Sequence, residues 1–341
     1  KVAEAAVVST ATVSRALSGK ANVSDATREH VRNVARRLGY VASASASSLA
    51  SGRTRNVGIV MPFLDSWFYT TVLSGAHQIL TDAGFDVTLY HLESTPIGIA
   101  PSEEHPRRTR LFDEILLRGR VDALLAVGLE LTPGELDRLH SVGRPVVGIG
   151  GPLAGATTIS VDDHEVARLA TEHLLALGHR HIAHIGGSQD FELDFHVPAT
   201  RRSGFEDAMS AAGVTVDQRL VRAADFTIAG GYDAARQLLG DPRVQPTAIF
   251  AASDEMAIGA MLAARDAGRS VPADMSVIGI DGHGLGEFFG LTTVTQFPRR
   301  QGEHAAQLLL GLLDGSSSAS EEDIRAECEL VVRRSTAAPA A

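Results

Sequence analysis

The first forty residues follow the spacing of short amphipathic helices. After Ser9, apolar side chains recur on one face at Val13, Ala16 and Leu17, which predicts a helix of about three turns. Ser9 is a suitable N-cap because its hydroxyl can accept a backbone N–H at the start of a helix. The opposite face is predicted to carry small side chains and one cation: Thr10, Ala11, Ser14 and Arg15.

A second helix is predicted after a turn at residues 18–19. Ser24, followed by Asp25, is its expected N-cap, and Gly39 suits its C-terminal stop. Its apolar face keeps the i, i+3, i+4, i+7 spacing at Val31, Val34, Ala35 and Leu38. Residues 2–6 would supply a preceding helix, and because the helical spacing starts at once with Lys1, we expect some residues to precede it. Three short helices and a basic surface are the minimum needed to present a recognition helix to a DNA major groove.

Residues 41–52 are rich in alanine and serine and offer no side chains for a core. Serine lowers helix propensity, so a helix here is predicted to be marginal by itself. We therefore expect residues 1–40 to form a DNA-binding domain and residues 41–56 to form a conditional hinge.

From Val57 onward, short apolar strands alternate with amphipathic helices. This alternation is typical of parallel sheets covered by helices on both faces. The predicted fold class is α/β: an all-α helix-turn-helix head on a two-lobed body with two doubly wound parallel sheets. Strands are predicted at residues 57–61, 87–90, 123–127, 145–149, 181–185, 248–250 and 277–280.

The break between lobes is expected near residues 158–163, with late segments such as 291–296 crossing back. We assign residues 57–160 and 291–318 to the N-terminal lobe, and residues 161–290 and 319–341 to the C-terminal lobe. Doubly wound sheets bind ligands at the carboxyl ends of their strands, which predicts a crevice between the lobes.

Composition and charge narrow the function. The single cysteine, Cys328, cannot form an intrachain disulfide, and no long charge-free apolar run predicts a membrane span, so we expect a cytoplasmic protein. Residues 1–55 hold nine Lys or Arg and three Asp or Glu, which is a net charge of +6. The remaining residues carry a net charge of −16, and the two parts sum to the −10 of the whole chain. A basic head on an acidic body predicts phosphate contacts at one end only.

These residues resemble the lactose/purine repressor (LacI/GalR) family over nearly the whole chain. In the head, the resemblance rests on Val8-Ser9-x-x-Thr12-Val13-Ser14-Arg15-Ala16-Leu17, Val23-Ser24-x-x-Thr27-Arg28 and Leu38-Gly39-Tyr40. In the body it rests on Leu177-Gly178-His179-Arg180-His181-Ile182, Arg201-x-x-Gly204-Phe205, Ser276-Val277-Ile278-Gly279-Ile280-Asp281 and Leu291-Thr292-Thr293-Val294. The resemblance implies a repressor whose operator affinity is controlled by a small molecule.

Several positions depart from the family pattern. Val7 stands where the family usually has glycine, and a β-branched residue resists positive φ, so an altered turn is expected. Ala42 and Ser43 stand where the family has a Pro-Asn pair before the hinge, and Ser47 stands where it has an arginine. These replacements predict weaker or differently specific docking of the hinge. Ile149 replaces a common acid and Gly282 follows Asp281 in place of a polar residue, which leaves a sugar-like effector favoured but not fixed.

The resemblance also assigns DNA-binding residues. Taken alone, the polar face of the first long helix would be a solvated surface, but within the family motif it faces the major groove. Leu49 matches a leucine that wedges into the minor groove, although it would otherwise pack the hinge. The DNA-binding residues implied are Ser9, Thr10, Ala11, Thr12, Ser14, Arg15, Ser24 and Leu49.

Effector contacts are implied at strand-end loops of the body. Phe68 and Tyr69, beside Trp67, match aromatic contacts, although aromatic residues after a strand are more often core. Arg201 and Asp281 match a clamping pair that would otherwise form surface salt bridges. Phe226 and Asp254 are further candidates on the same argument.

Other chemistry is less well supported. The histidines at positions 164, 173, 179, 181 and 184 do not repeat a zinc-ligand spacing, and the glycines at 148–151 and 282–286 match no phosphate-binding motif, so we predict no metal and no cofactor. A two-lobed transport protein would not need the basic head, and an enzyme would need an acid/base pair that we do not find. The expected partners are a near-palindromic operator DNA, a small-molecule effector and a second copy in a homodimer, with no membrane.

Overall fold

The computed structural model describes residues 1–17, 23–40, 53–92, 110, 119–141, 143–187, 195–318 and 320–340. The chain divides into two compact units, Lys1–Arg55 and Asn56–Ala341, which we call the head and the body. Their boundary falls at the end of the predicted hinge, most of which lies outside the described residues.

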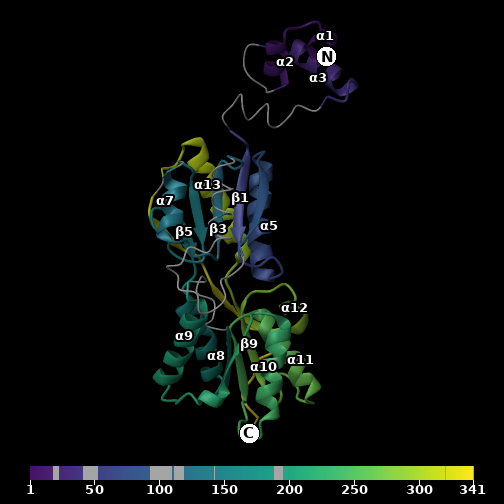
Figure 1. Ribbon diagram of the computed structural model, residues 1–341. Coiled ribbons are helices and arrows are strands. Elements are labelled where there is room, and N and C mark those ends of the chain that lie inside the picture. Colours follow the sequence, from purple (N-terminus) through teal and green to yellow (C-terminus); the bar gives the residue numbers. More distant parts are fainter. Residues whose placement is uncertain are drawn as a thin grey trace. The chain divides into compact units, whose positions relative to one another are not determined.

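The head consists of the three predicted helices, α1 (Val2–Ala5), α2 (Thr10–Leu17) and α3 (Asp25–Arg37) (Figure 1). Both predicted caps are present: Ser9 Oγ accepts the Thr12 N–H at 3.0 Å, and Ser24 Oγ accepts the Thr27 N–H at 3.3 Å. The helices share one small apolar core, formed by Val2, Ala6, Val13, Ala16, Val31, Val34 and Ala35. The helical spacing of the sequence therefore places the buried face correctly except at Leu38, which is 51% exposed.

Val7, in the turn between α1 and α2, adopts a φ of 53°. The left-handed conformation that glycine usually provides is therefore kept despite the β-branched side chain, and the turn is strained rather than altered. The Val7 side chain is 88% exposed, so it gains no burial that would offset this strain.

The first sheet of the body has the order β11-β5-β4-β3-β1-β2. All of its neighbouring strands pair in parallel. Its strands are β1 (Asn56–Met61), β2 (Asp86–His91), β3 (Ala123–Val127), β4 (Val146–Ile149), β5 (Thr157–Ser160) and β11 (Glu322–Arg325).

The second sheet has the order β12-β10-β9-β8-β6-β7, and only the β10–β12 pair is antiparallel. Its strands are β6 (Ile182–Gly187), β7 (Val221–Ala224), β8 (Ala248–Ala251), β9 (Ser276–Asp281), β10 (Thr292–Thr295) and β12 (Glu329–Val331). The predicted α/β class with two parallel-dominated sheets is confirmed.

Helices cover both faces of each sheet because successive side chains of a strand point to opposite faces. On the first sheet, α5 (Trp67–Asp82) and α13 (Pro298–Asp314) pack on one face and α7 (Pro133–Ser141) on the other. On the second sheet, α10 (Ile228–Gly240) and α11 (Asp254–Asp266) oppose α8 (Asp163–Ala176) and α9 (Val197–Ala211) (Figure 1). A short helix, α12 (Gly286–Phe289), follows β9.

Two late strands lie in the opposite lobe from the one expected. Residues 291–318 were assigned to the N-terminal lobe, but β10 pairs with β9 in the second sheet, and only α13 of this range packs on the first sheet. Residues 319–341 were assigned to the C-terminal lobe, but β11 pairs with β5 in the first sheet. The chain therefore crosses between lobes after residue 295 and again after residue 325. Strand spacing alone does not reveal which neighbour a strand will pair with.

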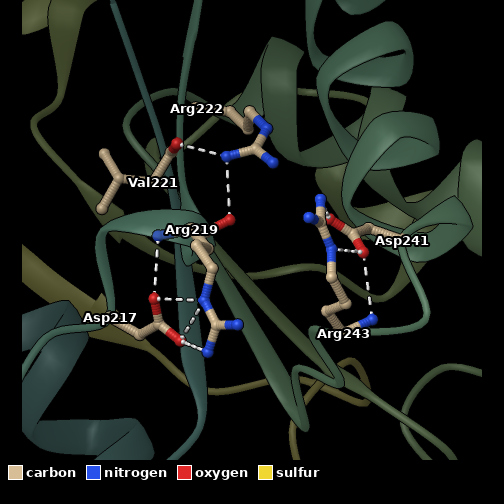
Figure 2. A network of polar contacts seen from close by, with 6 residues as sticks. All are labelled: Asp217, Arg219, Val221, Arg222, Asp241 and Arg243. Atoms are coloured by element: carbon tan, nitrogen blue, oxygen red, sulfur yellow. Dashed lines mark hydrogen bonds and ion pairs between the residues drawn. The ribbon is translucent and has the colours of Figure 1, made fainter.

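Two local Asp-x-Arg pairs stabilise the loops that lead into β7 and β8 (Figure 2). Asp217 accepts hydrogen bonds from the backbone and side chain of Arg219, which lower the pKa of this carboxyl to about 2. Asp241 accepts the same pair of bonds from Arg243, at 3.0 and 2.8 Å. Arg222 donates to the carbonyl oxygens of Arg219 and Val221, both at 2.8 Å. These contacts order the end of the second sheet where β7 and β8 begin.

Candidate DNA-reading face and effector cavity

The predicted DNA-contacting residues that the structure describes lie along α2 and at the N-caps of α2 and α3. Thr10, Ala11, Ser14 and Arg15 are exposed along α2, on the side opposite the buried Val13 and Ala16. The Ser9 and Ser24 hydroxyls each accept a backbone N–H at the start of a helix, so both serines act as N-caps. Thr12 is half-buried, and its hydroxyl lies 2.9 Å from that of Ser9. Leu49 lies outside the described residues.

The body holds a cavity of about 400 Å³ at the carboxyl ends of its strands, where doubly wound sheets bind ligands. Phe68 and Tyr69, at the start of α5, line it from the first lobe. Arg201, Phe226 and Asp281 line it from the second lobe. Five of the six predicted effector residues therefore surround one cavity.

Arg201 is held in place by contacts within the second lobe. Its Nε donates to Asp163 Oδ1 at 2.7 Å, and its Nη1 donates to the carbonyl oxygen of Ala252. Both charged side chains are largely buried, with 7% of Arg201 and 13% of Asp163 exposed. Asp163 also lines the cavity but was not among the predicted residues. The sequence around Asp163 did not indicate this role, because Arg201, its partner, lies 38 residues away in the chain.

Asp281 ends β9 with a φ of 128°, a conformation that non-glycine residues rarely adopt. Its Oδ1 accepts a hydrogen bond from Gln296 Nε2 at 2.6 Å, and the Gln296 carbonyl oxygen accepts one from Gln301 Nε2 at 2.6 Å. Burial raises the pKa of Asp281 to about 7, although the nearby Arg201 guanidinium opposes this shift. Gln296 and Gln301 both line the cavity. They were not predicted from the sequence, because their spacing does not distinguish them from residues that cap a helix.

Asp254 differs from the prediction, because it is fully buried and is not among the residues that line the cavity. Its Oδ2 accepts hydrogen bonds from the backbone N–H groups of Gly282 and His283, at 2.9 and 2.7 Å. Burial and the neighbouring Asp281 carboxylate raise its pKa well above the usual range. Asp254 therefore positions the loop after Asp281 from beneath, and its neighbours Ser253 and Glu255 reach the cavity instead.

Glu255 joins the two lobes beside the cavity. Its Oε2 accepts hydrogen bonds from the Trp67 N–H at 3.2 Å and from Ser66 Oγ at 3.4 Å, at the N-terminus of α5. The Trp67 ring lies against the His283 ring, with centroids 4.4 Å apart. Of the three neighbouring aromatic residues in the sequence, Trp67 thus makes a structural contact between lobes, while Phe68 and Tyr69 face the cavity.

The histidines noted in the sequence have separate neighbours. His164 pairs with Asp207 at 2.8 Å, His173 with the Thr336 hydroxyl at 2.9 Å, and His179 with the Thr247 hydroxyl at 2.9 Å. Within the described ranges, no three His, Cys, Asp or Glu residues are grouped so as to hold a metal ion. In the same part of the chain, no helix has the length and apolar character needed to cross a membrane.

A basic helix-turn-helix head and a body with a ligand-sized cavity at its strand ends define a ligand-responsive DNA-binding regulator. The comparisons with known proteins agree. The model for bacterial regulatory proteins of the lacI family matches residues 1–43, and that for the periplasmic binding protein-like domain matches residues 171–336. The HTH-type transcriptional repressor CytR of Escherichia coli K12 is 31% identical, with 99% of this chain and 95% of CytR covered. The chain belongs to the lacI family.

Solved structures show the same likeness. A complex of the transcriptional regulator CelR with cellobiose matches with a TM-score of 0.69 and 30% identity, covering 98% of both chains. The lac repressor dimer bound to operator and the anti-inducer ONPF matches with a TM-score of 0.81 and 25% identity, covering 99% of this chain and 98% of that one. The resemblance inferred from the sequence is confirmed.

Proposed function

We propose that the protein is a transcription repressor whose affinity for an operator is controlled by a small molecule bound in the cavity. The observation that carries this proposal is the cavity lined from both lobes of a body that is joined to a separate, basic helix-turn-helix head. A ligand that contacts both lobes must favour one arrangement of them, and differential affinity is what shifts a conformational equilibrium.

The operator is proposed to be near-palindromic and to be bound by a homodimer. The exposed face of α2 spans only two turns, so one head contacts too few base pairs for specificity, and two-fold pairing doubles the contact. The lac repressor was solved as a dimer on its operator, which supports this reading. Because chromosomal DNA is the proposed target, we expect the protein to act in the cytoplasm.

The effector is proposed to be sugar-like in size and shape. Phe68 and Tyr69 offer aromatic faces for the apolar side of a ring, while Arg201 and Asp281 offer hydrogen bonds to its polar edge. CelR was solved with cellobiose in a structure similar to this one. We expect binding without turnover, since the relatives described above are named as transcription regulators.

The link between the two sites is proposed to be the hinge at residues 41–56. A marginal helix can form or melt with a small change in the spacing of the paired hinges, and Leu49 would enter the minor groove only when the hinge is folded. A coupling free energy of about 1–3 kcal/mol would change operator affinity by roughly 5-fold to 150-fold.

A gel-shift titration tests the DNA-binding part. The full-length protein should bind a palindromic fragment from its own upstream region far more tightly than a single half-site. Arg15→Ala should weaken specific binding by about 1–3 kcal/mol if this side chain contacts a base. Arg236→Ala, on the exposed face of α10 in the body, is the matched control and should bind as the parent does. Equal affinity of the Arg15 variant and the parent would remove Arg15 from the interface.

A further inference from the structure

The charge of the cavity lining is strongly one-sided. The lining includes five carboxylates, from Asp65, Asp163, Asp225, Glu255 and Asp281. Arg201 is the only basic side chain among the described residues that line it. Arg201 is paired with Asp163 and also interacts electrostatically with Asp281, so three carboxylates, those of Asp65, Asp225 and Glu255, remain without a cationic partner in the lining.

These three carboxylates come from both lobes and retain capacity to accept hydrogen bonds. Asp65 is exposed on the loop before α5 and has no partner among the described residues. Asp225 uses Oδ1 to accept bonds from the Thr227 N–H and hydroxyl, which leaves Oδ2 for another donor. Glu255 likewise uses only Oε2 in its contacts with the first lobe.

Three of the lining carboxylates, Asp65, Glu255 and Asp281, are also close enough for one to influence the next. Burial raises the pKa of Glu255, and the Asp65 carboxylate raises it further. Glu255 in turn contributes to the raised pKa of Asp281. Carboxylates that are partly buried close to other carboxylates are stabilised in their charged form by a bound cation and destabilised further by a bound anion.

Aromatic rings complete the lining. Phe63, Phe68 and Tyr69 form a cluster in the first lobe, with ring centroids 5.5 Å apart for Phe63 and Tyr69 and 5.4 Å apart for Phe68 and Tyr69. Phe226 lines the cavity from the second lobe, and Phe195, which packs against a core cluster of the first lobe, lines it as well. Ring faces attract cations, so aromatic and carboxylate groups in one cavity favour the same kind of ligand.

We propose that the effector of this protein carries a protonated amine, as an amino sugar does, rather than being a neutral or acidic sugar. This inference rests on the proposed function, because it specifies the ligand of the cavity that controls DNA binding. The amine would lie among Asp65, Asp225 and Glu255, and the rings would contact its apolar carbons. Acidic and phosphorylated metabolites would be excluded by the same charges.

The test compares ligands that differ only in charge. Full-length protein is titrated by calorimetry at low salt with glucosamine, glucose and glucuronate, and with the matching amine, hydroxyl and acid forms of galactose and sorbitol. At least one amine should bind about tenfold or more tightly than its hydroxyl analogue. This preference should shrink as salt is added, because Asp65 and Asp225 are exposed and salt screens exposed charges.

Variants then locate the charge. Asp65→Asn and Asp225→Asn should each weaken binding of the preferred amine by about threefold to tenfold and leave its hydroxyl analogue nearly unchanged. Asp233→Asn removes an exposed carboxylate of α10 that does not line the cavity and is the matched control. Equal losses for the amine and its hydroxyl analogue would mean that these residues act on the shape of the site and not through charge.

The outcomes separate the two proposals. Operator binding is measured by gel shift on the same protein samples without any sugar. If the parent binds its operator but its tightest probe is neutral or acidic, or if no amine in the series binds, the amine proposal is overturned and the repressor proposal stands. If an amine binds but the operator does not, the repressor proposal fails and the ligand class is retained.

Discussion

Replacing Val7 by glycine should stabilise the head. Val7 holds a φ of 53° in the turn between α1 and α2, where an L-residue brings its Cβ too close to the backbone. With 88% of the residue exposed, removing the side chain sacrifices almost no buried surface. The variant therefore tests backbone strain with little interference from packing.

The expected magnitude is the difference between two effects. Relief of the left-handed strain is worth about 1–2 kcal/mol. The greater freedom of glycine in the unfolded chain costs about 0.4–1 kcal/mol. Strain relief wins by about 1 kcal/mol, which is roughly a fivefold decrease in the equilibrium constant for opening the head.

Amide hydrogen exchange of the full-length protein measures this effect without separating the domains. Peptides covering α2 and α3 should exchange about fivefold more slowly in Val7→Gly than in the parent, while peptides of the body should be unchanged. The matched control is Ala6→Gly, one residue earlier, at a position with a φ of −90° and a buried methyl group. It should act in the opposite direction, because glycine there gains no strain relief and loses both backbone order and buried surface.

Two results would refute the reasoning. Faster exchange in Val7→Gly would mean that the unfolded-state cost exceeds the strain. A similar change in both variants would mean that exchange reports a general effect of glycine in this turn.

Two predictions concern the body. Arg201→Met should lower the free energy of unfolding of the body by about 3–5 kcal/mol in urea, because Asp163 is left buried and unpaired. Adding Asp163→Asn to this variant should restore part of the loss. If the effects of the two substitutions are strictly additive, the two side chains are not coupled. His184 packs against both the Phe205 and the Phe250 ring, with centroids 5.0 and 4.9 Å away, and burial lowers its pKa from 6.5 to about 4. Because the unfolded chain takes up this proton first, stability should fall by about 3 kcal/mol as the pH drops from 6.5 to 4. His184→Phe should remove that part of the pH dependence whereas His304→Gln should not, and an unchanged acid slope in His184→Phe would contradict the assignment.

The sequence by itself determined the elements of this protein. Helical spacing placed the buried face of the head, and Ser9 and Ser24 were identified as caps because a cap is a local hydrogen bond between neighbours in the chain. Apolar runs located the strands that are buried on both faces, such as β3. Shorter or more polar strands, including β5, β7 and β11, gave no such run and were missed.

The tertiary structure decided which of these elements meet. Pairing places β10 beside β9 and β11 beside β5, and no periodicity within either strand specifies that neighbour. The family pattern brought Phe68, Tyr69, Arg201, Phe226 and Asp281 to attention, but only the fold shows Asp163 holding Arg201 and Asp254 lying beneath the cavity. A hydrogen bond between residues far apart in the chain leaves no mark on local spacing. The roles of the charged groups therefore depend on the packing of two lobes, while the elements that carry them are set by residues close in sequence.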